Sequence, residues 1–236
     1  MNVLTRKLEG WGELHASDKK VLDQVVSDSF TVDADQDLIR DGHQPTNVHL
    51  ILEGLACRYK LLRNGRRQIF AYLVPGDFCD LHTSILKTMD HSVATISHCV
   101  VVEIPSQTVL DLIENHPRIA RALEWVTLVD IATLREWIVN VGQREAKESM
   151  AHLLCELLVR LEAVGLVRGG KYDLPLTQAE LGDTLGLSNV HVNRVLKHLR
   201  TKGLVTVFER SVHIPDVAKL KDYAGFNPNY LHQQSG

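Results

Sequence analysis

Two short amphipathic helices are predicted towards the C-terminal end of the chain. Thr177 and Glu180 have the spacing of a capping box, and Leu181 and Leu185 then lie one turn apart on a single face. Gly186 follows, and its tolerance of positive φ suits a sharp turn. The second helix has apolar residues at i, i+3, i+4 and i+7, which form one buried stripe: Val192, Val195, Leu196 and Leu199.

The outer face of this second helix, predicted over residues 188–202 with Ser188 as N-cap, is basic. Every charged residue in it is a cation: Arg194, Lys197, Arg200 and Lys202. Residues 203–208 and 212–214 then alternate as a β-hairpin, which is the order of a winged helix-turn-helix. An ordinary helical hairpin with a basic solvated face is the alternative. We favour a DNA-binding module in which the second helix enters the major groove, with contacts from Ser188, Asn189, Val190, His191, Asn193, Arg194, Lys197 and Arg200.

Short extended runs separated by Gly, Pro and Asp-Gly occupy residues 30–104. Asn64-Gly65 lies between two such runs and is a strong hairpin signal, because both positions tolerate positive φ. Many short strands without helices between them predict an antiparallel sandwich or barrel.

A helix far longer than its neighbours is predicted over residues 117–142, with an interruption near its end that suggests a hinge. Its apolar residues fall on two sides. One side carries Ile119, Leu123 and Val126, and the other carries Leu128, Ile131, Ile138 and Val141. A helix that is apolar on two sides must be covered on both, so we expect pairing with the same helix of a second subunit. A single helix buried in a monomer is the alternative. Residues 148–161 are predicted to form a further amphipathic helix.

Composition supports a globular protein, with 44% hydrophobic and 23% charged residues. The net charge of −3 means that any affinity for nucleic acid must come from a local basic patch. Cys57, Cys79, Cys99 and Cys155 contain no C-x-x-C pair, which argues against zinc or a cysteine-ligated cluster and favours reduced, buried thiols. We expect no signal peptide, no membrane span and a cytoplasmic location.

Both halves of the chain contain recognisable motifs: Leu52-Glu53-Gly54, Asn64-Gly65 with Gln68-Ile69, Tyr72-Leu73-Val74-Pro75-Gly76-Asp77-Phe78, Leu181-Gly182, Gly186-Leu187-Ser188, Val192, Asn193-Arg194 and Leu196. In this order they resemble the motifs of the Crp/Fnr family of bacterial transcription regulators. The resemblance covers residues 15–215. It implies a homodimer that binds a palindromic DNA site and recruits or blocks RNA polymerase.

The resemblance also implies an α+β fold of four parts. A β-roll similar to cyclic-nucleotide-binding domains, with an N-terminal helix, covers residues 1–116. The dimerisation helix and hinge cover residues 117–142, and the winged helix-turn-helix covers residues 143–225. Residues 226–236 are expected to be a flexible tail.

Arg194 matches the family's base-reading arginine, whose guanidinium binds guanine O6 and N7 together. Where the family often has glutamate, this chain has Val190, which can pack on a thymine methyl group. Asn193 is expected to add a base or phosphate contact. Lys197, Arg200 and Lys202 are expected to hold phosphates.

The effector site departs further from the family pattern. The motif that surrounds a cyclic nucleotide phosphate matches here only as Asp80, His91 and Ser92. The permanently charged arginine is replaced by His91, so we do not expect cyclic AMP as the effector. No cofactor is predicted with certainty. Haem, metal or redox sensing remains an alternative, because histidines are numerous in the β-domain: His43, His49, His82, His91 and His98.

An enzyme on a cupin-like barrel is the second alternative. Such a site needs two histidines and a carboxylate close together on strands, and the sequence has no H-x-H pair followed by Glu. No Ser/His/Asp, paired-carboxylate or phosphate-loop arrangement has a suitable context either. We therefore expect a regulator without enzymatic activity.

Overall fold

The structure is a computed structural model that describes residues 1–233 and, within them, every side chain except those of residues 83 and 84. The chain divides into two compact units. The first comprises residues 1–60 and 70–131 together with the chain from residue 232. The second comprises residues 61–69 and 132–231.

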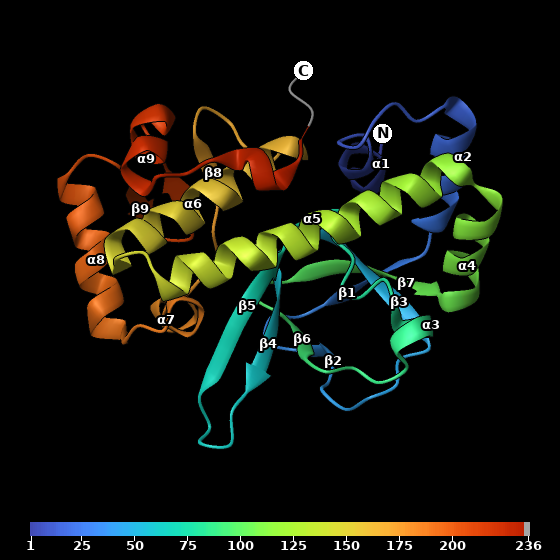
Figure 1. The fold of residues 1–236 in the computed structure, drawn as a ribbon, viewed down its shortest axis with the longest axis horizontal. Coiled ribbons are helices and arrows are strands. Elements are labelled where there is room, and N and C mark those ends of the chain that lie inside the picture. The colour runs from blue at the N-terminus through green and yellow to red at the C-terminus, as the bar shows by residue number, and fades with distance from the viewer. Residues whose placement is uncertain (234–236) are drawn as a thin grey trace. The chain divides into compact units, whose positions relative to one another are not determined.

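The first unit contains the strands predicted from residue 30 onward, with helices before and after them (Figure 1). Its elements are α1 (Val3–Leu8), α2 (Ala16–Val25), β1 (Ser29–Val32), β2 (Asp37–Ile39), β3 (Asn47–Glu53), β4 (Ala56–Leu61) except its last residue, β5 (Arg67–Leu73) from residue 70 onward, α3 (Thr83–Leu86), β6 (Ser92–Thr95), β7 (Cys99–Pro105), α4 (Ser106–Asn115) and the first part of α5 (Pro117–Gly142).

The strands form two sheets, in the orders β1-β7-β3 and β2-β6-β4-β5. Pairing is antiparallel between β1 and β7, β3 and β7, β2 and β6, and β4 and β6. Apolar side chains from both sheets share one buried cluster, so the predicted antiparallel sandwich is confirmed. The cluster contains Ile39, Ile51, Ala56, Leu73, Cys79, Met89, Val93, Cys99 and Val101.

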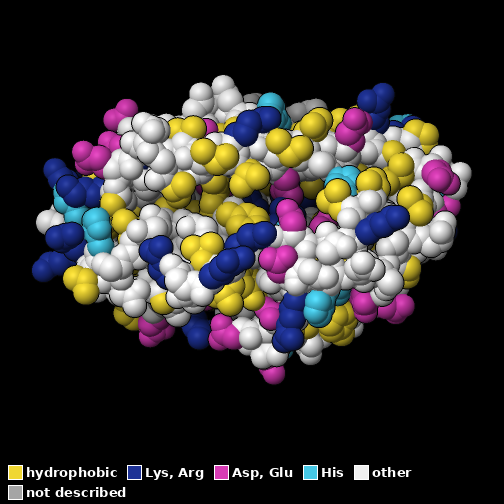
Figure 2. All heavy atoms as spheres, turned by 60° about the horizontal axis from the view of Figure 1, so that its bottom comes forward, with side chains coloured by type: hydrophobic (Ala, Val, Ile, Leu, Met, Phe, Trp, Pro, Cys, Tyr) yellow, Lys and Arg dark blue, Asp and Glu magenta, His cyan; other side chains and the backbone are white. Residues whose placement is uncertain are grey.

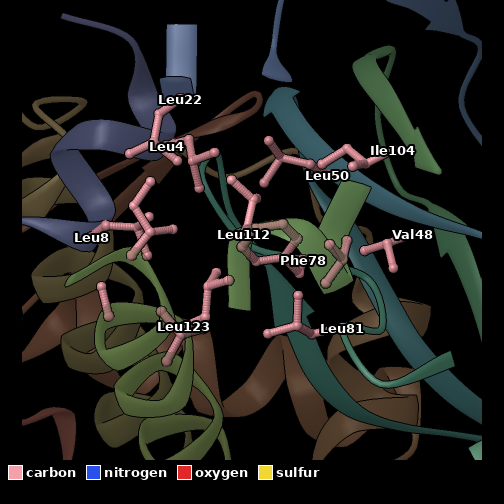
Figure 3. Packing of buried hydrophobic residues seen from close by; sticks show 14 of the residues in the cluster. Leu4, Leu8, Leu22, Val48, Leu50, Phe78, Leu81, Ile104, Leu112 and Leu123 are labelled. Carbon is pink, nitrogen blue, oxygen red and sulfur yellow. The ribbon is translucent and has the colours of Figure 1, made fainter. Parts of the chain in front are cut away.

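A second cluster joins the helices to the outer face of the β1-β7-β3 sheet. Figure 3 shows Leu4 and Leu8 of α1 pointing toward Leu123 of α5, while Leu50 lies near Ile104 on the neighbouring strand. Phe78 lies near the middle of this group, beside Leu112 of α4. The helices therefore bury their apolar stripes on one face of the sheet, as amphipathic helices must.

The predicted hairpin at Asn64-Gly65 is confirmed. Gly65 has φ of +80°. The N–H of Leu62 donates to the carbonyl of Arg66 at 2.8 Å, and the N–H of Gly65 donates to the carbonyl of Leu62 at 2.9 Å. A residue with a side chain tolerates this conformation poorly, which explains the glycine. Asn64 does not have positive φ, and its side-chain oxygen instead accepts from the N–H of Arg66 at 3.1 Å.

The second unit is built around α6 (Ala146–Ala163), whose residues Ser149–Leu161 are all buried. The expectation of an amphipathic helix here is wrong, because neighbouring elements cover α6 on several sides. The helices and strands of this unit are α6, β8 (Lys171–Asp173), α7 (Gln178–Leu185), α8 (Asn189–Thr201), β9 (Thr206–Phe208), β10 (Ser211–His213), α9 (Val217–Ala224) and the 3-10 helix η1 (Pro228–Leu231).

The long helix α5 belongs to the first unit through Ile131 and to the second from Ala132 onward. Its first predicted side, with Ile119, Leu123 and Val126, is buried. Its second side stays exposed, and Ile138 there has 64% of its surface accessible. Searched over the described part of the chain, no helix combines the length and the apolar character that a membrane crossing requires.

The C-terminal segment was expected to be flexible from residue 226. In the structure Phe226 is buried, and so is Leu231, the last residue of η1. The reason is the aromatic pair Phe226 and Tyr230, which packs around a histidine of α6. The last three residues of the chain lie outside the described residues.

Gly54 gives a prediction about stability. Its φ is +88°, and a Cβ atom there would meet the carbonyl oxygen of His98 and lie 2.7 Å from the Cys99 sulfur. We expect Gly54→Ala to lower the free energy of unfolding by roughly 1–3 kcal/mol, since it combines a strained backbone with a collision. Urea unfolding followed by circular dichroism measures this.

Gly65→Ala is the matched control. Its φ is similar at +80°, but a Cβ atom there would meet nothing within 4 Å. Only the left-handed backbone cost of about 1 kcal/mol applies. Equal losses for the two variants would contradict the packing argument.

Candidate nucleic-acid interface

The first helix of the predicted helix-turn-helix has the expected ends. The Thr177 hydroxyl accepts from the N–H of Glu180, and the Glu180 carboxylate accepts from the N–H of Thr177 at 2.7 Å. At the other end Gly186 has φ of +68° and donates its N–H to the carbonyl of Gly182. The capping box and the glycine stop predicted from the sequence are both confirmed.

The turn between the helices depends on Gly182 as well. A Cβ atom at this position would lie 2.5 Å from the carbonyl oxygen of Leu187, so only glycine lets the turn pass this close to α7. Sequence reasoning placed Gly182 in a family motif without giving this reason.

The second helix, α8, begins after Ser188, whose side chain accepts from the N–H of His191. Val192, Val195 and Leu199 are buried, and Leu196 is half-buried. The predicted stripe therefore fixes the rotation of α8 about its own axis. This rotation determines which side chains face outward.

The outward face carries the residues proposed for DNA contact. Val190 has 80% of its surface accessible, an unusual value for an aliphatic residue. His191 is half-buried, and the other predicted contact residues are exposed: Ser188, Asn189, Val190, Asn193, Arg194, Lys197 and Arg200. Within the described residues, Arg194, Lys197 and Arg200 take part in no ion pair, so their charges are available to phosphates.

The structure adds neighbours to this face that the sequence did not single out. Gln178 of α7 and Val207 of β9 line a shallow hollow of about 170 Å³ together with Asn193, Lys197 and Arg200. Gln178 is the first residue of α7, and its side chain is exposed. A polar residue directly after the cap is the only sequence signal for it.

The wing is also confirmed. β10 pairs antiparallel with β9, with Val212 opposite Val207, and also with β8. Phe208 at the wing tip is exposed. Figure 2 shows Lys, Arg and His side chains gathered at the left of the view, where Figure 1 draws α8.

The three residues that match the family's effector site, Asp80, His91 and Ser92, each have a different hydrogen-bond partner in the first unit. The Asp80 carboxylate accepts from the N–H of His82 at 3.0 Å, and the Ser92 hydroxyl accepts from the N–H of Asp41 at 3.0 Å. His91 Nδ1 lies 2.7 Å from the Asp90 carboxylate, and its ring meets Phe70 edge-on. Its Nε2 is buried and, within the described residues, has no hydrogen-bond partner.

Arg58 is a residue of this region that the sequence did not reveal. Its guanidinium donates to the carbonyl oxygens of Phe78 and Cys79 at 2.9 Å each and to the Asp130 carboxylate of α5 at 3.0 Å. Burial opposes the charge of Arg58, but Asp130 outweighs it and raises the Arg58 pKa. Arg58 is therefore a permanent cation that ties the loop before Asp80 to the long helix.

The four cysteines are all buried and free. Burial raises the pKa of the Cys79 and Cys155 thiols, the latter to about 12, so both stay protonated at neutral pH. Throughout the described chain, His, Cys, Asp and Glu side chains form no group of three or more that could hold a metal ion.

The fold and the exposed basic helix define a winged helix-turn-helix DNA-binding protein. Residues 149–223 match the family model of the Crp-like helix-turn-helix domain, and residues 30–116 match that of the cyclic nucleotide-binding domain. Together the two models match more than half of the chain. The chain belongs to the Crp/Fnr family of transcription regulators.

Relatives with curated names support this assignment. The chain is 27% identical to the transcriptional activator protein FnrL of Cereibacter sphaeroides, over 81% of this chain and 78% of FnrL. It is 27% identical to the nitrogen fixation regulation protein FixK of Bradyrhizobium diazoefficiens, over 76% of this chain and 74% of FixK.

A solved structure has the same fold. FixK2 from Bradyrhizobium japonicum superposes with a TM-score of 0.73 at 24% identity, covering 84% of this chain and 97% of FixK2. The predicted α+β architecture of β-domain, long helix and helix-turn-helix is thus confirmed.

Lys197 provides a test of the interface. Because it is exposed on α8 and unpaired within the described residues, we expect Lys197→Ala to weaken binding to all DNA sequences alike. The magnitude of the slope of log affinity against log salt concentration should fall by about 1 for each DNA-bound subunit. Fluorescence anisotropy with labelled duplexes at several salt concentrations measures both quantities.

Lys20→Ala in α2 is the control, since it removes the same charge from an exposed site in the first unit. If wild type and Lys197→Ala have the same salt slope, Lys197 does not contact a phosphate.

Proposed function

We propose that the protein acts as a homodimer that binds a palindromic DNA site, with α8 of each subunit in the major groove. The observation that carries this proposal is the outward face of α8, which combines exposed polar, apolar and cationic side chains opposite the buried Val192, Val195 and Leu199. Two such helices must lie about one DNA turn apart, roughly 34 Å, to enter successive major grooves.

Base reading is assigned to Arg194 and Val190 near the start of α8. A guanidinium that donates to guanine O6 and N7 contributes about 1–3 kcal/mol of discrimination. The isopropyl group of Val190 is exposed and suits the methyl group of thymine. The half-site therefore contains a guanine and a thymine read by these two residues, while Asn193, Lys197 and Arg200 hold the flanking bases and phosphates.

Dimerisation is assigned to the exposed side of α5. Ile131, Leu134, Ile138 and Val141 are all exposed, and their spacings of three, four and three residues fit positions a, d, a and d of a heptad repeat. Isoleucine at a with leucine at d favours two parallel strands. A parallel pair brings the C-terminal ends of both long helices together, and each continues into a DNA-binding unit.

We assign to the first unit the binding of an effector other than cyclic AMP. His91 supports this because its buried Nε2 lacks a partner within the described residues, and a ligand atom would satisfy it. A bound effector shifts the equilibrium between two dimer arrangements only by its difference in affinity for them.

The proposal also includes contact with RNA polymerase and a location in the cytoplasm. The relatives FnrL and FixK are named as a transcriptional activator and a regulation protein, so contact with polymerase at a promoter follows by analogy. Binding to chromosomal DNA places the protein in the cytoplasm.

Replacing Arg194 tests base reading. Sequences selected by wild type from a random duplex library should contain an inverted repeat with one guanine per half-site. We expect Arg194→Ala to lose the preference at that guanine, at a cost of about 1–3 kcal/mol in binding free energy, while preferences elsewhere persist. Selection and sequencing of bound duplexes measures this.

Arg200→Ala is the comparison variant, because Arg200 lies on the same helix but is assigned to phosphate. It should weaken binding without changing the selected sequence. A half-site that keeps its guanine preference in Arg194→Ala would contradict the assignment.

Replacing Ile138 tests dimerisation. A carboxylate at a heptad a position would be buried without a partner in the dimer, so Ile138→Glu should produce monomers. Monomers lose the second half-site, and affinity for the palindrome should fall at least 100-fold, about 3 kcal/mol. Analytical ultracentrifugation and anisotropy measure these two effects.

Val139→Glu is the matched control, because Val139 is also exposed but lies off the a/d seam. It should remain dimeric. Dimeric Ile138→Glu with wild-type affinity would locate the interface elsewhere.

A further inference from the structure

A buried carboxylate lies at the centre of the second unit. Glu156, in the middle of α6, has 0% of its surface accessible. Trp137 Nε1 donates to it at 2.9 Å, the Tyr230 hydroxyl donates at 2.9 Å, and Arg160 Nη1 donates at 3.1 Å. Burial of a charged group is costly unless it is paired and hydrogen-bonded, and here three donors compensate it.

The donors come from three different segments. Trp137 lies on α5, five residues before its last residue, and Arg160 lies on α6 one turn after Glu156. Tyr230 lies on η1, near the end of the described chain. One carboxylate thus connects the end of the long helix, the first helix of the DNA-binding region and the C-terminal segment.

Aromatic packing reinforces the same connection. His152, one turn before Glu156, is 1% exposed and stacks on Tyr230 with ring centroids 6.0 Å apart and planes at 16°. The Phe226 ring meets the His152 ring edge-on, with ring centroids 4.9 Å apart. Burial and the nearby Arg144 lower the His152 pKa to about 4, although Glu136 of α5 opposes them. The imidazole is therefore neutral at neutral pH and packs as an aromatic ring.

The C-terminal segment is not explained by the family domain. The helix-turn-helix family model ends at residue 223, whereas Phe226, Tyr230 and Leu231 lie beyond it and pack against the second unit. An apolar replacement for a buried charge network often gives equal or greater stability, so such a network is better suited to fix a geometry.

We propose that residues 226–231 form a clamp that uses Glu156 as a positioning residue to fix α6 against the end of α5. Only residues 143–145 connect these two helices, and rotation there would move α8 in each subunit. Directional hydrogen bonds to one carboxylate from both α5 and η1 prevent this rotation. The clamp thereby sets the separation of the two recognition helices. This inference rests on the proposed dimer and palindromic site.

Half-site spacing is the property to measure. Binding is compared on the selected palindrome and on duplexes whose half-sites are moved apart or together by one and two base pairs. Wild type should discriminate sharply among them, because its recognition helices are held at one separation. Tyr230→Phe removes a single donor and keeps the stacked ring, and Trp137→Phe removes the donor on α5.

We expect both variants to reduce the preference for the optimal spacing by about tenfold, as expected for losing one hydrogen bond to a charged group. All measurements are made well below the unfolding midpoint of each variant. A general loss of stability would lower binding to every spacing equally, so the ratio between spacings isolates the positioning role.

Tyr223→Phe is the matched control. It removes a hydroxyl from the same part of the chain, but this hydroxyl lies 3.3 Å from His198 Nε2 and not on Glu156. It should keep the wild-type ratio. Wild-type ratios in both Tyr230→Phe and Trp137→Phe would overturn the clamp while leaving the proposed function intact. A wild type that binds no inverted repeat would instead overturn the proposed function, and the clamp with it.

Discussion

Burial of the central part of α6 is the constraint on which the DNA-binding unit depends. Its residues Ser149–Leu161 are covered on every side, by α7, α8, α9 and η1 among others. Because α6 is covered in this way, α8 can bury only one stripe of its own surface against the unit. The remaining surface of α8 must face outward, and the sequence places Val190, Asn193 and Arg194 there. The DNA-contacting face is thus a consequence of packing as much as of its own composition.

The long helix α5, unlike α6, keeps one apolar side exposed. One side of α5 is buried within the chain, and its other side carries exposed isoleucine and leucine at heptad spacing. Scattered exposed apolar residues are ordinary on a protein surface, but a continuous seam on one helix face is typical of an interface. The same α5 also supplies Asp130 to Arg58 and Trp137 to Glu156. A single helix therefore carries an exposed apolar seam and makes polar contacts within each unit.

How much the sequence predicted depends on the range of the interactions involved. Thr177, Gly186 and Ser188 act on residues within four positions, so the boundaries of α7 and α8 follow from local rules. Glu156 could not be predicted, because its partners lie 19 residues earlier at Trp137 and 74 residues later at Tyr230. Without those partners a glutamate in a helix is expected to face water. The packed C-terminal segment was missed for the same reason, since Phe226 and Tyr230 pack against His152 of α6, which lies more than 70 residues earlier in the chain.

Two polar contacts of α5 connect the proposed effector site with the proposed DNA interface: Asp130, in the middle of the helix, binds Arg58, and Trp137, nearer its C-terminal end, binds Glu156. Arg58 holds the carbonyl oxygens of Phe78 and Cys79 and the carboxylate of Asp130 at once, so a ligand that moves this loop must lengthen or replace at least one of these bonds. Asp130 immediately precedes Ile131, the first apolar residue of the seam, and a displacement of Asp130 would therefore change seam packing. Packed interfaces change between discrete arrangements and do not deform continuously. In the proposed dimer, a small shift at Arg58 would thus select between two geometries of the seam, and the hydrogen bonds of Glu156 would transmit either geometry to α8.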